Sequence, residues 1–397
     1  MKLKNKNILY VVPSMESGGV ETGVLEVARQ VAKTKDFNMF LLSSGGGMLK
    51  KMDNLGINFI NLNVKSKNPI TIYKNINKIK KIIEDNGIEM VQVESRAPAW
   101  SCYFACKSLN IPMVTTIHGL YNNGCGIFSF FKKKYNSIMF RGNPIICVSS
   151  FVKDYSIGNF KEYIYKKQSR SSVEVLYRSI DTNLYSKEEV SINRILALQN
   201  ELKLPDDKII ITVPARFAEQ KGQDYFLKVL KHLKYDNYFC LLIGDTLKKP
   251  KYVKQIEVLT YKYGLQGFVK IHNNISDMPA LYSLSNILVS ASVKPESFGR
   301  ISIEAQAMEK IFIGTAIGGT LETVLDGETG FLVPENNERE FARILDKVIT
   351  MPEEEKKKIV KQGRERVVKN FAFDNFYGKL LKLYERVLNS DDFRFRN

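Results

Sequence analysis

The strongest constraint on the fold is that short β-rich runs alternate with longer helical patterns along the whole chain. Several of these runs, such as Asn38–Ser43 and Ile311–Thr315, are continuously apolar rather than alternating. Strands that are buried on both faces look like this, as in a parallel sheet covered by helices. Because the strand–helix alternation occurs twice, we expect an α/β protein with two doubly wound domains.

The predicted strands fall into two series. In the first half they are Asn7–Val12, Asn38–Ser43, Met90–Val93, Met113–Ile117, Pro144–Val148 and Val173–Tyr177. In the second half they are Lys208–Val213, Tyr238–Ile243, Phe268–Ile271, Asn286–Ser290, Ile311–Thr315 and Phe331–Val333. We therefore predict one Rossmann-like domain over residues 1–185 and a second over 186–372.

The last segment, 373–397, is predicted to be a helix and tail that crosses back to the first domain. Its apolar side chains recur at helical spacing, at Phe376, Leu380, Leu383, Tyr384 and Val387. A turn pattern at Leu204-Pro205-Asp206-Asp207 precedes the first strand of the second half.

Composition narrows the class of protein. With 397 residues, 44% of them hydrophobic and 25% charged, the chain is large enough for two or three packed domains and is neither disordered nor fibrous. The net charge is +17, and residues 1–180 carry +14 of it. This uneven distribution predicts an anionic surface or substrate that meets the first half.

The cysteines and the N-terminus indicate the compartment. Five cysteines cannot form a disulfide framework in a chain of this length, and the odd number fits a reducing cytosol. Cys102 and Cys106, four apart on a predicted helix, are interpreted as small buried side chains, because no second Cys/His pair at metal spacing accompanies them. The apolar run Ile8–Val12 is too short for a signal peptide, and no stretch approaches the roughly 18 apolar residues of a membrane span. We expect a cytoplasmic protein that is at most peripheral to a membrane.

Two candidate sites follow strands of the first half. Gly18 and Gly19 open a predicted helix, where free amides and the positive end of the helix dipole suit a phosphate, although a plain tight turn explains the pair equally well. His118 follows Met113–Ile117 and precedes a glycine-rich loop, at the edge of an open α/β sheet where ligands bind. The glycines of Ser44–Gly47 lack the spacing of a Walker phosphate loop and are predicted to form an ordinary loop.

Two further candidates lie in the second half. Arg216 and Lys221 follow the strand Lys208–Val213, and two cations in one loop suit a diphosphate leaving group. Glu296 lies in a turn with Gly299, and Glu304 lies about one turn inside the next predicted helix. A carboxylate in a polar cleft accepts hydrogen bonds from sugar hydroxyls, and a glycine allows close backbone amides.

Taken together, these segments resemble the retaining glycosyltransferases of family 4, which have the GT-B fold of two facing Rossmann-like domains. The match consists of ESFGRISIE, a Glu-x7-Glu motif, followed by GTAIGGTLETVLDGETGFLVP, together with ARFAEQKG, CVSSFVKD and VLYRSIDTNLY. It covers nearly the whole chain in the right order. The segments SKNP, ESRAPAWS, TTIHGLYN and YNSIMFRG resemble a bacterial subgroup that makes lipopolysaccharide and other envelope glycans.

The resemblance implies roles for the residues of the second half. Arg216 and Lys221 would hold the diphosphate of a nucleotide-sugar donor. Glu296 would bind hydroxyls of the transferred sugar, assisted by the backbone amides of Phe298 and Gly299, and Glu304 would bind the nucleoside ribose.

In the first half, the resemblance implies that Gly18 and Gly19 admit phosphate or acceptor at the cleft between the domains and that His118 reaches the sugar near the reacting carbon. It also implies transfer to a glycan or lipid-linked acceptor with neither a metal nor a cofactor. Many relatives have Asn-Gly-Val-Asp where this chain has Arg178-Ser179-Ile180-Asp181, so we assign these four residues no role.

Other functions remain open at this point. A nucleotide-sugar epimerase or a sugar phosphorylase could use the same fold. A basic nucleic-acid-binding protein would fit the charge, but no zinc-finger spacing or aromatic RNA-binding motif supports it, and we expect no nucleic-acid partner.

Membrane contact is the last expectation from the sequence. Phe130 and Phe131 stand beside Lys132–Lys134, and lysines also line one side of a predicted helix with isoleucines at 72, 76, 79 and 83. That helix is also explained by an apolar core face and a solvated lysine face. For the Phe–Lys cluster we predict peripheral docking on the cytoplasmic face of the inner membrane.

Overall fold

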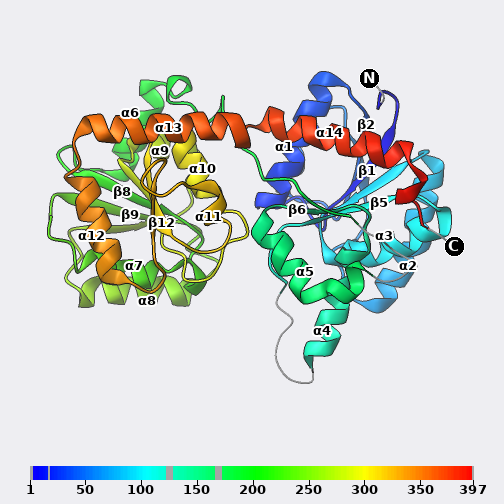
Figure 1. The fold of residues 1–397 in the computed structure, drawn as a ribbon, viewed down its shortest axis with the longest axis horizontal. Helices are drawn as coiled ribbons and strands as arrows, with labels where there is room; N and C mark the ends of the chain where they lie inside the picture. The colour runs from blue at the N-terminus through cyan, green and yellow to red at the C-terminus, as the bar shows by residue number, and fades with distance from the viewer. Residues whose placement is uncertain (1–2, 17, 122–127, 166–171, 396–397) are drawn as a thin grey trace. The chain divides into compact units, whose positions relative to one another are not determined.

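The chain divides into two compact α/β units. The computed structural model describes residues 3–16, 18–121, 128–165 and 172–395. One unit consists of Met1–Arg178 with Phe376–Asn397, and the other of Ser179–Asn375. Each unit contains its own sheet with helices packed against it (Figure 1).

The first unit is built on a seven-stranded sheet. Its strands are β1 (Asn7–Val11), β2 (Asn38–Ser43), β3 (Asn58–Asn61), β4 (Met90–Val93), β5 (Met113–Ile117), β6 (Ile145–Cys147) and β7 (Val173–Val175). Its helices are α1 (Gly19–Thr34), α2 (Pro69–Asp85), α3 (Arg96–Leu109), α4 (Phe128–Asn136), α5 (Ser150–Ile164) and the part of α14 (Phe373–Asn389) from Phe376 onward.

The second unit is built on a six-stranded sheet. Its strands are β8 (Ile209–Pro214), β9 (Tyr238–Ile243), β10 (Val269–His272), β11 (Ile287–Ser290), β12 (Ile311–Thr315) and β13 (Phe331–Val333). Its helices are α6 (Ile192–Leu202), α7 (Gln223–Leu230), α8 (Pro250–Lys262), α9 (Met278–Leu284), α10 (Arg300–Ala307), α11 (Thr320–Thr323), α12 (Glu338–Ile349) and α13 (Glu353–Phe371).

Both sheets are parallel and doubly wound, so the predicted fold class is confirmed. The strand orders are β3-β2-β1-β4-β5-β6-β7 and β10-β9-β8-β11-β12-β13. Each order reverses direction once, between β1 and β4 in the first sheet and between β8 and β11 in the second. In open α/β sheets, the crevice at the carboxyl ends of the two strands beside such a reversal is where ligands bind.

The strands that the continuous apolar runs form are buried on both faces of the sheet. In β8, Ile211 and Val213 belong to a hydrophobic cluster on one face of the sheet, whereas Ile210 belongs to the cluster on the other face. Cys102 and Cys106 are fully buried in α3, as predicted, and burial raises the pKa of the Cys102 thiol to about 12.

The structure differs from the sequence prediction at the edge of the first sheet. The strand β3 was not predicted, because Asn58–Asn61 is polar at both ends and mostly exposed. Its backbone pairs with β2 along Phe40–Ser43, so the neighbouring strand rather than its own composition makes it a strand.

The helix α14 packs on the first unit through a buried face. The face consists of Tyr377, Leu380, Leu383, Tyr384 and Val387. The predicted stripe is therefore correct except that Tyr377 rather than Phe376 is fully buried. The Tyr384 hydroxyl meets the Tyr10 hydroxyl of β1 and donates to Gln92 Oε1 of β4 over 3.3 Å.

The hydrogen bonds of the Tyr384 hydroxyl allow a prediction about the stability of the first unit. The change Tyr384→Phe keeps the ring but leaves Tyr10 and Gln92 with buried polar atoms that have lost a partner. We expect the free energy of unfolding to fall by about 1–3 kcal/mol. Fluorescence of Trp100, the single tryptophan, follows urea unfolding of this unit. The matched control is Tyr73→Phe on α2, where the ring is 71% exposed, and equal stability of the two variants would contradict the argument.

Candidate functional site

The second unit places its candidate residues at the reversal of its strand order. Arg216 and Lys221 follow the carboxyl end of β8, and Glu296 follows the carboxyl end of the neighbouring strand β11. Neighbouring parallel strands end at the same edge, so these loops lie together. The Lys221 ammonium donates to Glu296 Oε1 over 2.9 Å, and both side chains are mostly buried. Two residues that the sequence assigned to different parts of one ligand are thus in direct contact.

Hydroxyl groups complete the surroundings of Glu296. The same Oε1 accepts a hydrogen bond from Ser290 Oγ at 3.1 Å and another from Ser292 Oγ. Burial would raise the pKa of Glu296, but the charge of Lys221 and the hydrogen bonds from Ser292, Lys221 and Ser290 outweigh it. The pKa therefore lies below its ordinary value, and the carboxylate is ionised at neutral pH. These two serines were not predicted, although their position at and just beyond the carboxyl end of a strand was a usable signal.

Glycine backbone holds this carboxylate in place. Gly318 has φ +60°, and a Cβ atom there would lie 2.4 Å from the Glu296 carbonyl oxygen. The Gly319 amide donates to that same oxygen over 2.7 Å. A Cβ on Gly222, the residue after Lys221, would lie 2.1 Å from the Ala291 carbonyl oxygen. Gly222 thus lets the Lys221 loop approach the segment after β11, and Gly318 lets the loop after β12 approach the Glu296 backbone.

Glu304 occupies a separate position inside α10. Its Oε2 accepts from the Tyr282 hydroxyl of α9 at 2.6 Å, and its Oε1 accepts from Arg300 Nε at 3.2 Å. A carboxylate has about four acceptor positions, so these two partners orient Glu304 and leave acceptor capacity for a ligand. Glu296 and Glu304 share none of these partners.

The remaining predicted residues of this unit differ in exposure. The Arg216 side chain is exposed, and among the described residues it forms no ion pair. Phe298 is buried and packs edge-on against Phe371 at 5.7 Å between ring centroids. Gly299, with φ +83°, immediately precedes the first turn of α10, whose amides have no partner within the helix.

The first unit has its own polar cluster at the carboxyl edge of its sheet. Gly18 and Gly19 begin α1 after β1, and His118 follows β5. The Arg178 guanidinium connects the two, because it contacts the Gly19 carbonyl oxygen and lies 3.2 Å from His118 Nδ1. The sequence analysis assigned Arg178 no role, since it departs from the family pattern, yet it joins the two predicted sites of this unit.

Glu94, which sequence reasoning also missed, fixes the orientation of His118. Its Oε2 contacts His118 Nε2, and its Oε1 accepts from Gln92 Nε2 at 2.9 Å. Burial would raise the pKa of Glu94, but the hydrogen bonds from His118 and Gln92 and the charge of Arg178 keep it below its ordinary value. Arginine can only donate, so these partners assign the proton to Nε2 of His118 and the lone pair to Nδ1.

The polar cluster continues into the core of the first unit. Gln92 donates to Thr116 Oγ1 over 2.7 Å and accepts from Tyr384 of α14. His118 is therefore the outer end of a buried hydrogen-bonded chain that reaches the C-terminal helix. Among the described residues, no group of three or more His, Cys, Asp or Glu side chains is placed to hold a metal ion.

Comparison with known proteins identifies the class. Residues 195–366 match the model of glycosyl transferases group 1, and residues 17–184 match that of glycosyltransferase family 4. A crystal structure of a glycosyltransferase from Rickettsia africae is 35% identical, with a TM-score of 0.87 over 97% of this chain and 99% of that chain. The chain therefore belongs to glycosyltransferase family 4 and has the GT-B fold.

Two more distant relatives extend this comparison. The capsular polysaccharide biosynthesis glycosyltransferase CapM of Staphylococcus aureus is 23% identical over 98% of this chain and 100% of CapM. The Anabaena protein HepE, solved in complex with UDP and glucose, is 18% identical, with a TM-score of 0.80 over 96% of this chain and 100% of HepE. This chain is a nucleotide-sugar-dependent glycosyltransferase of a retaining family.

The contact between Lys221 and Glu296 allows a prediction of how the free energy of unfolding depends on pH. The change Lys221→Met leaves a buried carboxylate without its cation. We expect a loss of about 2–4 kcal/mol of unfolding free energy at pH 7, measured by urea unfolding with circular dichroism. The loss should shrink as the pH falls. In the wild type, the stabilisation is complete above the ordinary glutamate pKa of 4.5 and disappears as the pH falls through the lower folded value. In the variant, protonation relieves the unpaired charge.

The control for this prediction is an exposed ion pair in the same unit. Lys254 pairs with Glu257 on α8 at 3.2 Å, and both side chains are largely exposed. The change Lys254→Met should alter stability by less than about 1 kcal/mol. A loss in Lys221→Met that is as small as in the control, or that grows as the pH falls, would contradict the buried-pair interpretation.

Proposed function

We propose that this enzyme transfers a sugar from a nucleotide-sugar donor to a glycan or glycolipid acceptor of the bacterial envelope, with retention of anomeric configuration. The observation that carries the proposal is the contact between Lys221 and Glu296 at the strand reversal of the second sheet. It puts a cation suited to the leaving diphosphate next to a carboxylate suited to sugar hydroxyls. The match to CapM supports an envelope polysaccharide as the acceptor.

The chemistry of these groups fits departure of a diphosphate. As the bond between the anomeric carbon and the diphosphate oxygen breaks, negative charge grows on that oxygen, where Lys221 and Arg216 stabilise it. The acceptor oxygen forms its new bond on the same face of the sugar, and its proton passes to the leaving phosphate. Glu296 is ionised and can only accept hydrogen bonds, so it orients sugar hydroxyls rather than donating a proton.

The other predicted residues complete the donor site. Glu304, oriented by Tyr282 and Arg300, binds the ribose hydroxyls of the nucleoside. The amides at Phe298 and Gly299 support the sugar. In the first unit, Gly18 and Gly19 approach phosphate or acceptor, and His118 approaches the transferred sugar with its Nε2 proton held by Glu94.

These roles predict different defects in two conservative variants. Glu296→Gln should lower kcat about 100-fold and change the affinity for the free nucleoside diphosphate less than about three-fold, because this carboxylate contacts the sugar. Glu304→Gln should weaken nucleoside diphosphate binding about ten-fold. Calorimetry gives the affinities, and the first nucleotide to test is UDP, the ligand present in the HepE structure.

The same experiment tests the reaction itself. A radiolabelled donor incubated with and without acceptor should yield a glycoside only when acceptor is present, and NMR should show the anomeric configuration of the donor. An epimerised nucleotide sugar, or phosphate-dependent release of sugar phosphate, would contradict the transferase proposal. Equal weakening of free nucleotide binding in both variants, with unchanged turnover, would contradict the division of roles.

For the acceptor side, we propose that α4 touches an anionic membrane on the cytoplasmic face of the inner membrane. Phe130 and Phe131 are 66% and 64% exposed, and Lys132 and Lys134 are exposed beside them. Lys133 pairs with Glu162 of α5 at 2.8 Å, so it is partly neutralised. Exposed aromatics enter the interface of a bilayer, and each exposed cation adds about 1 kcal/mol near anionic lipid. No helix of the described part of the chain is long and apolar enough to span a membrane.

This surface predicts salt-sensitive binding to vesicles. The double change Lys132→Glu and Lys134→Glu should abolish co-sedimentation with anionic phosphatidylglycerol vesicles at low salt and leave nucleotide affinity unchanged. The matched control, Lys251→Glu with Lys262→Glu, reverses two exposed charges on α8 and should retain binding. Equal binding to neutral phosphatidylcholine vesicles at high salt would contradict the electrostatic explanation.

A further inference from the structure

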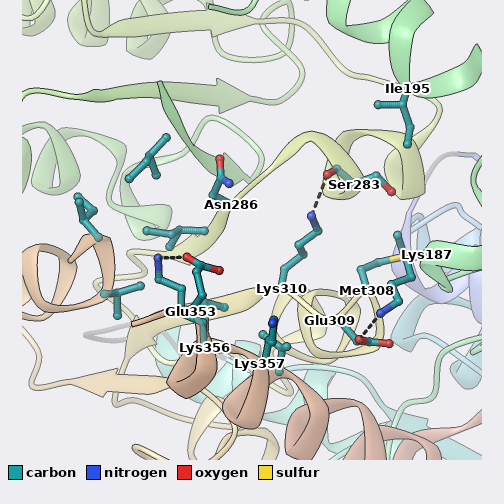
Figure 2. A pocket seen from close by; sticks show the side chains of 16 residues that line it. Lys187, Ile195, Ser283, Asn286, Met308, Glu309, Lys310, Glu353, Lys356 and Lys357 are labelled. Carbon is teal, nitrogen blue, oxygen red and sulfur yellow. Dashed lines mark hydrogen bonds and ion pairs between the residues drawn. The ribbon is translucent and has the colours of Figure 1, made fainter. Parts of the chain in front are cut away.

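A pocket of about 700 Å³ opens in the second unit at the amino-terminal edge of its sheet (Figure 2). Its wall includes the first residues of three strands, Ile209 of β8, Ile287 of β11 and Ile311 of β12. Glu296, in contrast, follows the carboxyl end of β11. Four strand residues span about 13 Å, so the pocket and the candidate donor site lie at opposite edges of the same sheet.

The lining of this pocket is amphipathic. The three isoleucines, with Met308, Ile349 and Val360, form its apolar part. Four lysines, Lys187, Lys310, Lys356 and Lys357, and two glutamates, Glu309 and Glu353, form its polar part. Lys357 pairs with Glu354, just outside the lining, at 2.8 Å, so the lining and this carboxylate together carry a net charge of +1 when every amine is protonated. A pocket of this size and composition suits a small anion that carries an apolar body.

Lys310 is the central cation of the pocket (Figure 2). Its ammonium donates to the Ser283 carbonyl oxygen over 2.8 Å, and among the described residues it forms no ion pair with a carboxylate. The two glutamates of the lining are already paired, Glu309 with Lys187 at 2.6 Å and Glu353 with Lys356 at 2.8 Å. Burial, reinforced by the charge of Lys187, lowers the pKa of Lys310 to about 8.

Two observations indicate a missing acceptor at this point. An ammonium has three donors, and a buried one is costly unless it is paired. The Ser283 hydroxyl is also buried, and it has no hydrogen-bond partner among the described residues. Neither group contributes to the donor site, because both lie at the other edge of the sheet. An anion beside Lys310 would accept from the ammonium and balance the charge of the lining.

We propose that this pocket binds a small amphiphilic phosphate monoester, with the phosphate at Lys310 and the hydrocarbon on the isoleucine surface. A phosphate monoester carries about −1.5 to −2 charges at pH 7 and several strong acceptor oxygens, which can accept from both the Lys310 ammonium and the Ser283 hydroxyl. The hydrocarbon would cover Ile209, Ile287 and Ile311 at the start of the strands.

The probe for this proposal is geranyl monophosphate, titrated into the full-length protein by calorimetry. We expect saturable binding with one site per chain. Inorganic phosphate and geraniol, which each lack half of the ligand, should bind at least ten-fold more weakly. The variant Arg216→Ala, which alters the proposed donor site alone, should bind the probe as the wild type does. Loss of probe binding in Arg216→Ala, or equal binding of inorganic phosphate, would overturn the proposal.

Variants of the lysines that line the pocket test whether the probe binds there. Lys310→Met removes the central cation without adding a charge, and it should weaken probe binding at least ten-fold. Lys187→Met together with Lys357→Met, at more exposed positions, should weaken it three- to ten-fold and stays informative if Lys310→Met fails to fold by circular dichroism. The matched control is Lys358→Met with Lys361→Met, two exposed lysines of α13 outside the lining. An equal loss in this control, or no saturable binding to the wild type, would overturn the site.

Discussion

Parallel pairing of every strand in the two sheets is the constraint on which the rest of the structure depends. Parallel strands need a crossover between them, and the crossover helices cover both faces of each sheet. All carboxyl ends then meet at one edge, and the reversal of strand order leaves an opening there. Lys221 and Glu296 lie at this opening in the second unit, and Gly18 and Glu94 follow the corresponding strands, β1 and β4, in the first.

Within that frame, close backbone packing sets the electrostatics of the donor site. Gly222 allows the loops of Lys221 and Glu296 to approach until the two side chains touch in a mostly buried place, and Gly318 allows the loop after β12 to pack on the Glu296 backbone. Burial alone would raise the pKa of Glu296, and the cation and two serine hydroxyls outweigh that effect. The glycines after β12, Gly318 and Gly319, therefore act on the Glu296 backbone.

In the first unit, a chain of hydrogen bonds links the surface to the core. Arg178 contacts His118, His118 contacts Glu94, and Gln92 continues the chain to Tyr384 of the last helix. Each member restricts the next, so the ring orientation of His118 depends on a helix that begins more than 250 residues later in the chain. This dependence gives the C-terminal helix a role in the site as well as in packing.

The sequence by itself determined the fold class, nearly every strand and the buried stripe of α14, because apolar periodicity is a local property that burial on both faces imposes. It also determined which side chains follow the strands at the reversal points. It did not show β3, whose pairing partner makes it a strand, or the roles of Glu94 and Arg178, which depend on contacts with His118 across 24 and 60 residues of chain. The lowered pKa of Glu296 and the lysine pocket at the opposite edge were likewise decided by tertiary structure, because charge and burial come from residues that only the folded chain brings together.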